Sequence, residues 1–397
     1  MYRKLLIPLA LVAILSLAIC GTSRSDPKPG IVTQPLVAGL DPANFRRVWM
    51  NIMPVDAGDQ VNRIYLDKDT VFIATLNNVF YNTDRSTGVM RYFRYVDGGG
   101  RQVRTPVVMQ NYVVYLGQSN LEVYTHGGDY VKSIPLGFTI SSGAVASGDD
   151  LYLGADLAGG ELAQVNITAP YRNVHWRLIT NGEIGGKPAF FKDTIYVGNG
   201  SGGVMAVTPD REAAWTLEHD AFQTDGAVLG DVFAEDLGVY AASASGRLVC
   251  LDPNNGRLKW QYLAPHPLYN GPVVTATTVY QYVPSHGLAA IDKSAKITID
   301  PDGRRTIDQQ DRPARWINPD AVQFVAEDKN FTYVRTVLGE LWALDHKTGE
   351  VRYRGSGVHF AAIATNTFDN IIYASMRDGV TYAIRPALQL GSPGYLK

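Results

Sequence analysis

The side chains that could do chemistry are few in this sequence, and none has a recognisable catalytic or metal-binding spacing. Seven histidines are scattered between positions 126 and 359, without the close pairing that metal ligands show in sequence motifs. The two cysteines, Cys20 and Cys250, are too few for a disulfide framework, and we expect Cys250 to be a small core residue. No glycine-rich loop precedes a helical pattern, so a nucleotide site has no support. We therefore predict no catalytic residue, no cofactor and no metal.

Acidic residues gather in one segment, Lys293–Ala314. Carboxylates at this density could bind calcium, but their spacing is not that of a calcium loop and arginines alternate with them. Apolar and polar residues alternate on both sides of Pro301-Asp302-Gly303, which predicts a protruding β-hairpin. It offers three candidate partner contacts: Ile297, Ile299 and Ile307. The segment Leu263–Tyr269 is a second candidate, and for both the alternative is loop variation without a function.

The first twenty residues have the pattern of an export signal. A basic start precedes an apolar run, Leu5–Ile19, that is too short for a membrane-spanning helix. The end of this run resembles a bacterial lipobox, so we expect a signal peptide over residues 1–20 and lipid attachment at Cys20. By the same resemblance, Gly21 after the cysteine favours the periplasmic face of the outer membrane. The alternative is ordinary cleavage, which would release a soluble exported protein.

The composition is that of a protein with a large folded core. Of the 397 residues, 46% are hydrophobic and 19% are charged, and the net charge is near −2. This balance gives no excess of basic residues of the kind that binds nucleic acid. Residues 21–45 lack apolar periodicity and are expected to be a flexible tether, and residues 387–397 a C-terminal tail.

A short β-type run centred on an aromatic residue recurs along most of the chain. Its first and last aromatic residues, Phe72 and Tyr373, are 301 positions apart over seven intervals, which gives a mean period of 43. Repeats of this length built from strands are typical of β-propeller blades. The eight runs are Thr70–Thr75, Val113–Gln118, Asp150–Ala155, Thr194–Asn199, Gly238–Ser243, Thr278–Val283, Phe331–Thr336 and Ile371–Met376.

Each repeat can be divided into four strands, and this division predicts how the ring closes. The first strand follows a Pro or Gly, as in Gly226–Val228, and the fourth contains an aromatic such as Trp49 or Trp215. Trp49 precedes the first complete repeat, whereas the last repeat ends near Ile384 without a fourth strand. We therefore predict an all-β, eight-bladed β-propeller of four-stranded antiparallel blades over residues 46–386. The N-terminal strand would complete the C-terminal blade and so protect an open sheet edge.

Three repeats contain an Asp-x3-Gly-x3-aromatic motif between the third and fourth strands. The aspartate is expected to accept backbone N–H bonds in a tight turn, and the glycine to adopt positive φ. The aromatic side chain is expected to lie between neighbouring blades. These residues are Asp84, Gly88 and Tyr92; Asp252, Gly256 and Trp260; and Asp345, Gly349 and Tyr353.

The segment Arg247–Tyr262, followed by Gly271–Val274, resembles the repeat of quinoprotein-type (PQQ-repeat) β-propellers. With the lipobox-like start and eight repeats, the chain resembles the lipoprotein family of outer-membrane β-barrel assembly. That resemblance implies a non-enzymatic scaffold at the periplasmic face of the outer membrane. Its partners would be other envelope proteins, bound partly by adding strands to exposed sheet edges.

Three other functions stay open at this stage. Quinone-dependent dehydrogenases share the repeat, but by family resemblance they cover the cofactor with a vicinal cysteine pair, which this sequence lacks. A small ligand could bind in the central channel, or the protein could be a hydrolase. Converging acids, amides or histidines at the channel mouth would favour these two alternatives, and an apolar or mixed rim would favour docking.

Overall fold

A computed structural model describes residues 40–41, 44–100, 103–217, 220–294, 297–299, 305–307, 311–355 and 358–388. Cys20, the expected signal peptide and most of the expected tether lie outside these residues. Every element in the described part is a β-strand, which confirms the all-β prediction. No helix in this part is long and apolar enough to cross a membrane.

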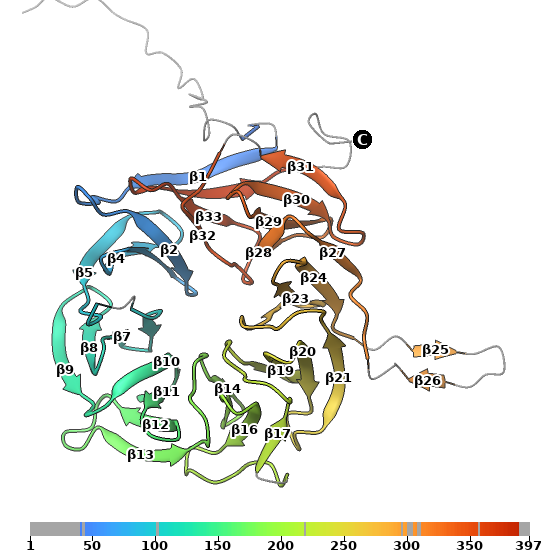
Figure 1. The fold of residues 1–397 in the computed structure, drawn as a ribbon. Coiled ribbons are helices and arrows are strands. Elements are labelled where there is room, and N and C mark those ends of the chain that lie inside the picture. Colours follow the sequence, from blue (N-terminus) through green and yellow to red (C-terminus); the bar gives the residue numbers. More distant parts are fainter. Residues whose placement is uncertain are drawn as a thin grey trace, which may run out of the picture. The chain divides into compact units, whose positions relative to one another are not determined.

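Eight four-stranded antiparallel sheets form the blades of a β-propeller in the described residues (Figure 1). We number them along the chain from the sheet that begins at Val61. Blade 1 contains β2 (Val61–Leu66), β3 (Thr70–Thr75), β4 (Val79–Asp84) and β5 (Met90–Tyr95). Blade 2 contains β6 (Val107–Val108), β7 (Tyr112–Leu116), β8 (Asn120–Thr125) and β9 (Tyr130–Pro135). Blade 3 contains β10 (Thr139–Ser147), β11 (Asp150–Asp156), β12 (Glu161–Asn166) and β13 (Val174–Ile179).

The following blades keep the same order from the inner to the outer strand. Blade 4 contains β14 (Ala189–Phe191), β15 (Thr194–Gly198), β16 (Gly203–Val207) and β17 (Ala221–Gln223). Blade 5 contains β18 (Phe233–Glu235), β19 (Gly238–Ala242), β20 (Arg247–Leu251) and β21 (Leu258–Leu263). Blade 6 contains β22 (Val273–Val274), β23 (Thr278–Val283), β24 (Gly287–Asp292) and β27 (Trp316–Asn318). Blade 7 contains β28 (Ala321–Glu327), β29 (Phe331–Thr336), β30 (Leu341–Asp345) and β31 (Val351–Gly355).

Blade 8 is assembled from both ends of the described chain, as the sequence predicts. It consists of β32 (Ala362–Ile363), β33 (Ile372–Ser375), β34 (Val380–Pro386) and β1 (Phe45–Ile52), in that order. β1 pairs antiparallel with β34, with Arg47 opposite Ile384 and Trp49 opposite Ala383. The predicted closure is therefore confirmed. A ring sealed in this way has no free sheet edge between its first and last strands.

The hydrophobic core is divided among the blade interfaces. One buried apolar cluster lies between each pair of neighbouring blades in the described structure, including one between blades 8 and 1. The second and third strands of a blade face such clusters on both sides, which explains their nearly continuous burial, as in β3. An outer strand such as β1 alternates between buried and exposed residues.

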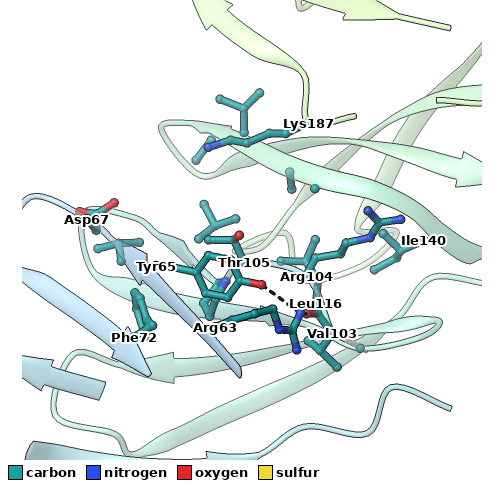
Figure 2. Close-up of a pocket in the computed structure, with 18 of the residues that line it drawn as sticks. Arg63, Tyr65, Asp67, Phe72, Val103, Arg104, Thr105, Leu116, Ile140 and Lys187 are labelled. Carbon is teal, nitrogen blue, oxygen red and sulfur yellow. Dashed lines mark hydrogen bonds between the residues drawn. The ribbon is translucent and has the colours of Figure 1, made fainter. Parts of the chain in front are cut away.

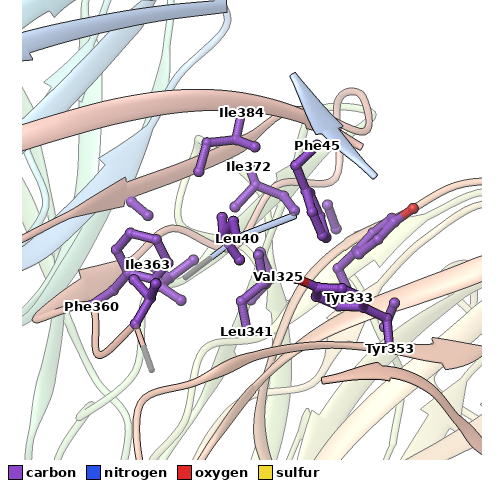
Figure 3. Packing of buried hydrophobic residues seen from close by; sticks show 14 of the residues in the cluster. Leu40, Phe45, Val325, Tyr333, Leu341, Tyr353, Phe360, Ile363, Ile372 and Ile384 are labelled. Atoms are coloured by element: carbon purple, nitrogen blue, oxygen red, sulfur yellow. The ribbon is translucent and has the colours of Figure 1, made fainter. Parts of the chain in front are cut away.

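The core between blades 7 and 8 extends into two segments that the sequence assigns to a tether and a tail. Leu40 and Phe45 are buried there beside Tyr333 and Tyr353 (Figure 3). Leu388 packs in the same cluster, and the N–H of Ala387 donates to the carbonyl of Asn44. The folded part therefore begins before residue 46 and extends beyond residue 386, because β1 and β34 bring the flanking residues together.

Two strand assignments from the sequence are wrong. Trp215 is not in the fourth strand of blade 4, since the chain leaves the sheet after the bridge between Val207 and Ala213 and returns only at β17. Gly226–Val228 is not the first strand of blade 5, which is β18. This segment instead forms backbone hydrogen bonds to neighbouring loops, for example from the N–H of Val228 to the carbonyl of Asn199.

The predicted hairpin is present as a separate two-stranded sheet. β25 (Ile297–Ile299) pairs with β26 (Arg305–Ile307), and the register places Ile297 opposite Ile307 (Figure 1). The side chains of this ribbon lie outside the described part, so their role as partner contacts stays a prediction.

Candidate functional site

Each Asp-x3-Gly turn packs against an aromatic residue of the preceding blade. The aspartate Oδ1 accepts a hydrogen bond from the backbone N–H two residues later: Ser86 to Asp84 (3.0 Å), Asn254 to Asp252 (2.8 Å) and Lys347 to Asp345 (3.0 Å). The glycines have positive φ: Gly88 (+75°), Gly256 (+71°) and Gly349 (+72°). A Cβ built on these glycines would meet the rings of Trp49, Trp215 and Trp316 at 2.5–2.6 Å. The motif thus has a structural role in joining blades.

The tryptophan indoles complete this contact with a hydrogen bond. Each donates from Nε1 to the carbonyl of the residue that follows the aspartate: Trp49 to Arg85 (2.9 Å), Trp215 to Pro253 (3.0 Å) and Trp316 to His346 (3.1 Å). The aromatic residues of the motif itself take part at the next interface, where Tyr92 packs on Gly128 and Trp260 lies under the guanidinium of Arg312. A buried aromatic with a satisfied N–H suits this position.

The central channel contains a cavity of about 710 Å³ (Figure 2). Its wall comes from the inner strands of blades 1–3 and from the links that enter blades 2, 4 and 5. Apolar residues such as Phe72, Leu116 and Ile140 line part of it. Its volume falls within the range of small-molecule sites.

Three cations line this cavity: Arg63, Arg104 and Lys187. The Arg63 guanidinium donates to the hydroxyl of Tyr65 (2.9 Å) and to the carbonyl of Val103 (2.6 Å), and Arg104 donates to the carbonyl of Ser141. Within the described residues, none of the three forms an ion pair with a carboxylate. Burial raises the pKa of Tyr65, and the neighbouring charge of Arg63 opposes this shift.

Two acids, Asp67 and Asp231, also line the cavity, so its charge is mixed. Asp231 accepts the backbone N–H of Lys187 (2.8 Å), which orients the link into blade 4. No histidine contributes to the wall, and the described residues contain no group of three or more side chains able to hold a metal. The two arginines and the lysine give this cavity groups that can bind a small anion.

A second candidate surface lies on the outer strands of blades 8, 1 and 2. These strands are at the edge of their sheets and pair on one side only. They expose several large apolar side chains in consecutive blades: Val48, Met50 and Ile52 from β1; Phe93 and Tyr95 from β5; and Tyr130 and Val131 from β9. We call these residues the apolar edge surface. The outer strands of blades 3, 5 and 6 expose one large apolar side chain each, and the outer strand of blade 7 exposes Arg354 instead; the three apolar residues are Ile179, Leu263 and Ile317.

The other candidate residues from the sequence do not form a site in the described structure. In the segment Leu263–Tyr269, Leu263 and Tyr269 are exposed and Leu268 is buried. Cys250 is buried, and desolvation raises the pKa of its thiol to about 12, so it is neutral at ordinary pH. His126 and His359 each contact backbone carbonyls. A ligand in the central channel was one of the open alternatives, but the residues of the cavity and of the apolar edge surface were not predicted, because no short motif marks either one.

The fold defines the class of protein: it is an eight-bladed β-propeller, and its repeat resembles the PQQ repeat. A family model described as outer membrane protein assembly factor BamB matches residues 158–299. The curated BamB of Shewanella oneidensis is 26% identical over 132 residues, which is 33% of this chain and 32% of that protein. The match thus spans about a third of the curated relative. The chain resembles BamB, and this is the resemblance that the sequence predicts.

Solved structures agree on the fold. The crystal structure of BamB from Moraxella catarrhalis matches with a TM-score of 0.63 and 16% identity, over 88% of this chain and 99% of that chain. A quinohemoprotein alcohol dehydrogenase from Comamonas testosteroni matches with a TM-score of 0.58 and 12% identity, over 91% of this chain and 79% of that chain. Since propellers with different functions share this geometry, these matches establish the fold alone.

Proposed function

We propose that this protein is a non-enzymatic, lipid-anchored scaffold of the cell envelope that binds partner proteins during the assembly of outer-membrane β-barrel proteins. The resemblance to BamB in repeat and fold supports this role. The export signal and lipobox-like end at Cys20 agree with a location at the periplasmic face of the outer membrane. In this proposal, the propeller supplies a rigid body whose surface docks other proteins.

The apolar edge surface is the observation on which the docking role rests. An outer strand with unpaired backbone N–H and C=O groups can accept an added strand from another protein. In β1, exposed Met50 and Ile52 alternate with less exposed residues, so a partner strand could pair with the backbone and cover these side chains together. The proposed occupant is therefore an extended segment of a partner protein with apolar side chains.

The ribbon formed by β25 and β26 is proposed as a second contact. It pairs with no blade, so its edges and its three isoleucines, Ile297, Ile299 and Ile307, are candidates for binding a partner. The exposed residues Leu263 and Tyr269 lie on the link that enters blade 6 and are proposed as a weaker candidate.

Affinity capture of the full-length protein from cell envelopes tests this function. We expect the wild type to recover β-barrel assembly proteins, and the double variant Phe93→Glu/Tyr95→Glu to recover them at most weakly, because charge on the outer strand opposes burial. Arg354→Glu, on the polar outer strand of blade 7, is the matched control and should behave as wild type. Recovery of no assembly protein by the wild type would contradict the proposed function, and equal recovery by the double variant would contradict the proposed surface.

Binding of a small anion in the central cavity is the second candidate function. It is favoured by the three cations of the wall, which form no ion pair with a described carboxylate. We expect phosphate or a small dicarboxylate to raise the unfolding temperature of the wild type but not of Arg104→Gln. If neither anion changes the unfolding temperature of the wild type, this second function is wrong.

A further inference from the structure

A second cavity, of about 410 Å³, opens on one rim of the ring at blades 7, 8 and 1. Its wall comes from the turn between β29 and β30, the turn between β33 and β34, the link into blade 8 and the start of β2. The residues on which the argument rests are Arg335, Val337, Leu338, His359 and Arg377. None of the described residues that line this cavity carries a carboxylate.

Arg335 occupies a position that is otherwise part of the packed interior. Side chains alternate along β29, so Phe331, Tyr333 and Arg335 share the face toward blade 8. Phe331 and Tyr333 belong to the core cluster between blades 7 and 8, which also includes Phe360, and Arg335 continues this row to the rim. Its Nη2 atom lies 3.7 Å from a Cβ built on Gly339, which places the guanidinium under the turn.

The equivalent position holds a small residue in blades 4, 5 and 8, and a tyrosine, Tyr282, in blade 6. In blade 7, the residue after Arg335 donates its N–H to the carbonyl four positions further on, as Thr336 does to Glu340. The same hydrogen bond in blades 4, 5 and 8 identifies the counterparts of Arg335 as Gly198, Ala242 and Ser375, all of them buried. A charged side chain at this position is therefore a departure from the repeat.

The Arg335 guanidinium has no partner in the described structure. Its buried Nε forms no hydrogen bond, and no ion pair of this side chain is formed with a described residue. Burial lowers the pKa of Arg335, with no opposing acid. A partly desolvated guanidinium without an acceptor costs free energy, which a bound anion would recover.

The surroundings favour an anion that is attached to apolar groups. Arg377 adds a second positive charge to the wall, and Val337 and Leu338 are 72% and 68% exposed at its edge. His359 donates from Nδ1 to the carbonyl of Leu338 (2.9 Å), so the turn that presents these two side chains is held in place. A guanidinium binds a carboxylate through two parallel hydrogen bonds.

We propose that this rim cavity binds a peptide carboxylate, which Arg335 holds through paired hydrogen bonds while apolar peptide side chains cover Val337 and Leu338. The site would recognise an acidic or C-terminal carboxylate on a partner protein. The choice of a protein as the ligand rests on the proposed function. The anion site itself depends on Arg335 and not on the apolar edge surface.

The test compares two forms of one peptide on the intact protein. An N-acetylated apolar tetrapeptide with a free C-terminal carboxylate and the same peptide as its C-terminal amide are titrated by calorimetry. We expect the carboxylate form to bind the wild type about tenfold or more tightly than the amide, as expected for charge-assisted hydrogen bonds. Arg335→Gln should remove this difference, whereas the control Arg354→Gln, an exposed arginine of the same blade, should keep it.

Equal binding of acid and amide to the wild type, or an unchanged difference in Arg335→Gln, would overturn the proposal. If acetate competes as strongly as the peptide, the site binds free anions and the peptide assignment is wrong. The comparison of acid and amide on the wild type needs no folded variant, and thermal unfolding shows whether Arg335→Gln is folded. Carboxylate binding that depends on Arg335 would stand even if the envelope capture recovered no assembly protein.

Discussion

At the scale of single residues, the blades are joined by a glycine that faces an indole ring. Gly256 has a φ of +71°, and a Cβ at this position would lie 2.6 Å from the ring of Trp215. The position therefore requires glycine for two independent reasons, backbone conformation and contact with the preceding blade. The same holds for Gly88 against Trp49.

We expect Gly256→Ala to destabilise the protein by about 2–5 kcal/mol, since left-handed strain costs roughly 1–2 kcal/mol and overpacking roughly 1–3 kcal/mol. Gly137→Ala is the matched control, because Gly137 has a φ of +75° but no atom within 4 Å of its built Cβ. Its loss should be limited to about 1–2 kcal/mol of backbone strain. Chemical denaturation of both variants measures the difference, and equal losses would contradict a role for the indole contact.

The stability that the Asp84 turn contributes should depend on pH. The hydroxyl of Ser86 and the other donors around the carboxylate hold the pKa of Asp84 well below its usual range. Because the folded-state pKa is depressed, the stabilisation is present above the unfolded pKa of about 3.9 and is lost as pH falls below it. The gap in unfolding temperature between the wild type and Asp84→Asn should therefore narrow between pH 5 and pH 2. A gap that stays constant would show that Asp84 does not titrate in this way.

At the scale of elements, β1 acts as the fourth strand of the last blade and also supplies Trp49 to the interface between blades 8 and 1. Trp49 is buried beside Tyr373, and its indole donates to the carbonyl of Arg85 in blade 1. Met50, the next residue, is 43% exposed. One strand therefore offers a buried position and an exposed position for comparison.

We expect Trp49→Ala to lower the free energy of unfolding by about 3–5 kcal/mol, the cost of removing a buried large aromatic. Met50→Ala should change it by less than about 1 kcal/mol, because the side chain leaves no cavity. Thermal and chemical unfolding of both variants test this. Similar losses in the two variants would mean that Trp49 does not anchor β1.

The sequence was sufficient to predict which elements exist, because the inner strands need apolar runs and the period of the repeat sets the blade length. It failed where an aromatic marks an interface without marking a strand. Trp215 makes the same contact as Trp49, yet it lies in a loop before β17. Gly226–Val228 looked like a strand but is a link, since its backbone groups bond to loops.

The candidate sites were harder to predict from the sequence than the blades. The central cavity is formed by residues from several blades, and no linear spacing brings Arg63, Arg104 and Lys187 together. Arg335 is different, because comparison of the repeats position by position would have shown an arginine where other blades have Gly198, Ala242 or Ser375. That its guanidinium lacks a partner depends on packing, which a single sequence does not specify.

At the scale of the whole molecule, the ring is held by hydrogen bonds between strands that come from opposite ends of the chain. A circular permutant that begins at Gly58 and ends at Ala57 tests how much this strand exchange contributes to the stability of the ring. A short linker between residues 388 and 40 would suffice, because Ala387 already contacts Asn44. Blade 8 would then be one continuous segment without a covalent link to blade 1, joined to it by side-chain packing and by hydrogen bonds such as that from the Val61 N–H to the carbonyl of Arg377.

We expect the permutant to form the same propeller but to unfold at a temperature a few degrees lower. The reason is that local opening between blades 8 and 1 would no longer be opposed by a strand exchange at that interface. Circular dichroism checks the fold and calorimetry the unfolding temperature. An unfolding temperature equal to that of the wild type would mean that the strand exchange adds no stability.

The pairing of β1 with β34 also sets an order of events in synthesis. β1 is among the first elements to leave the ribosome, and its partner is among the last, some 330 residues later. Throughout this interval the growing polypeptide presents an unpaired apolar strand and an incomplete ring, the kind of species that aggregates or binds chaperones. The ring can therefore close only when β34 is available to pair with β1, however early the single blades fold.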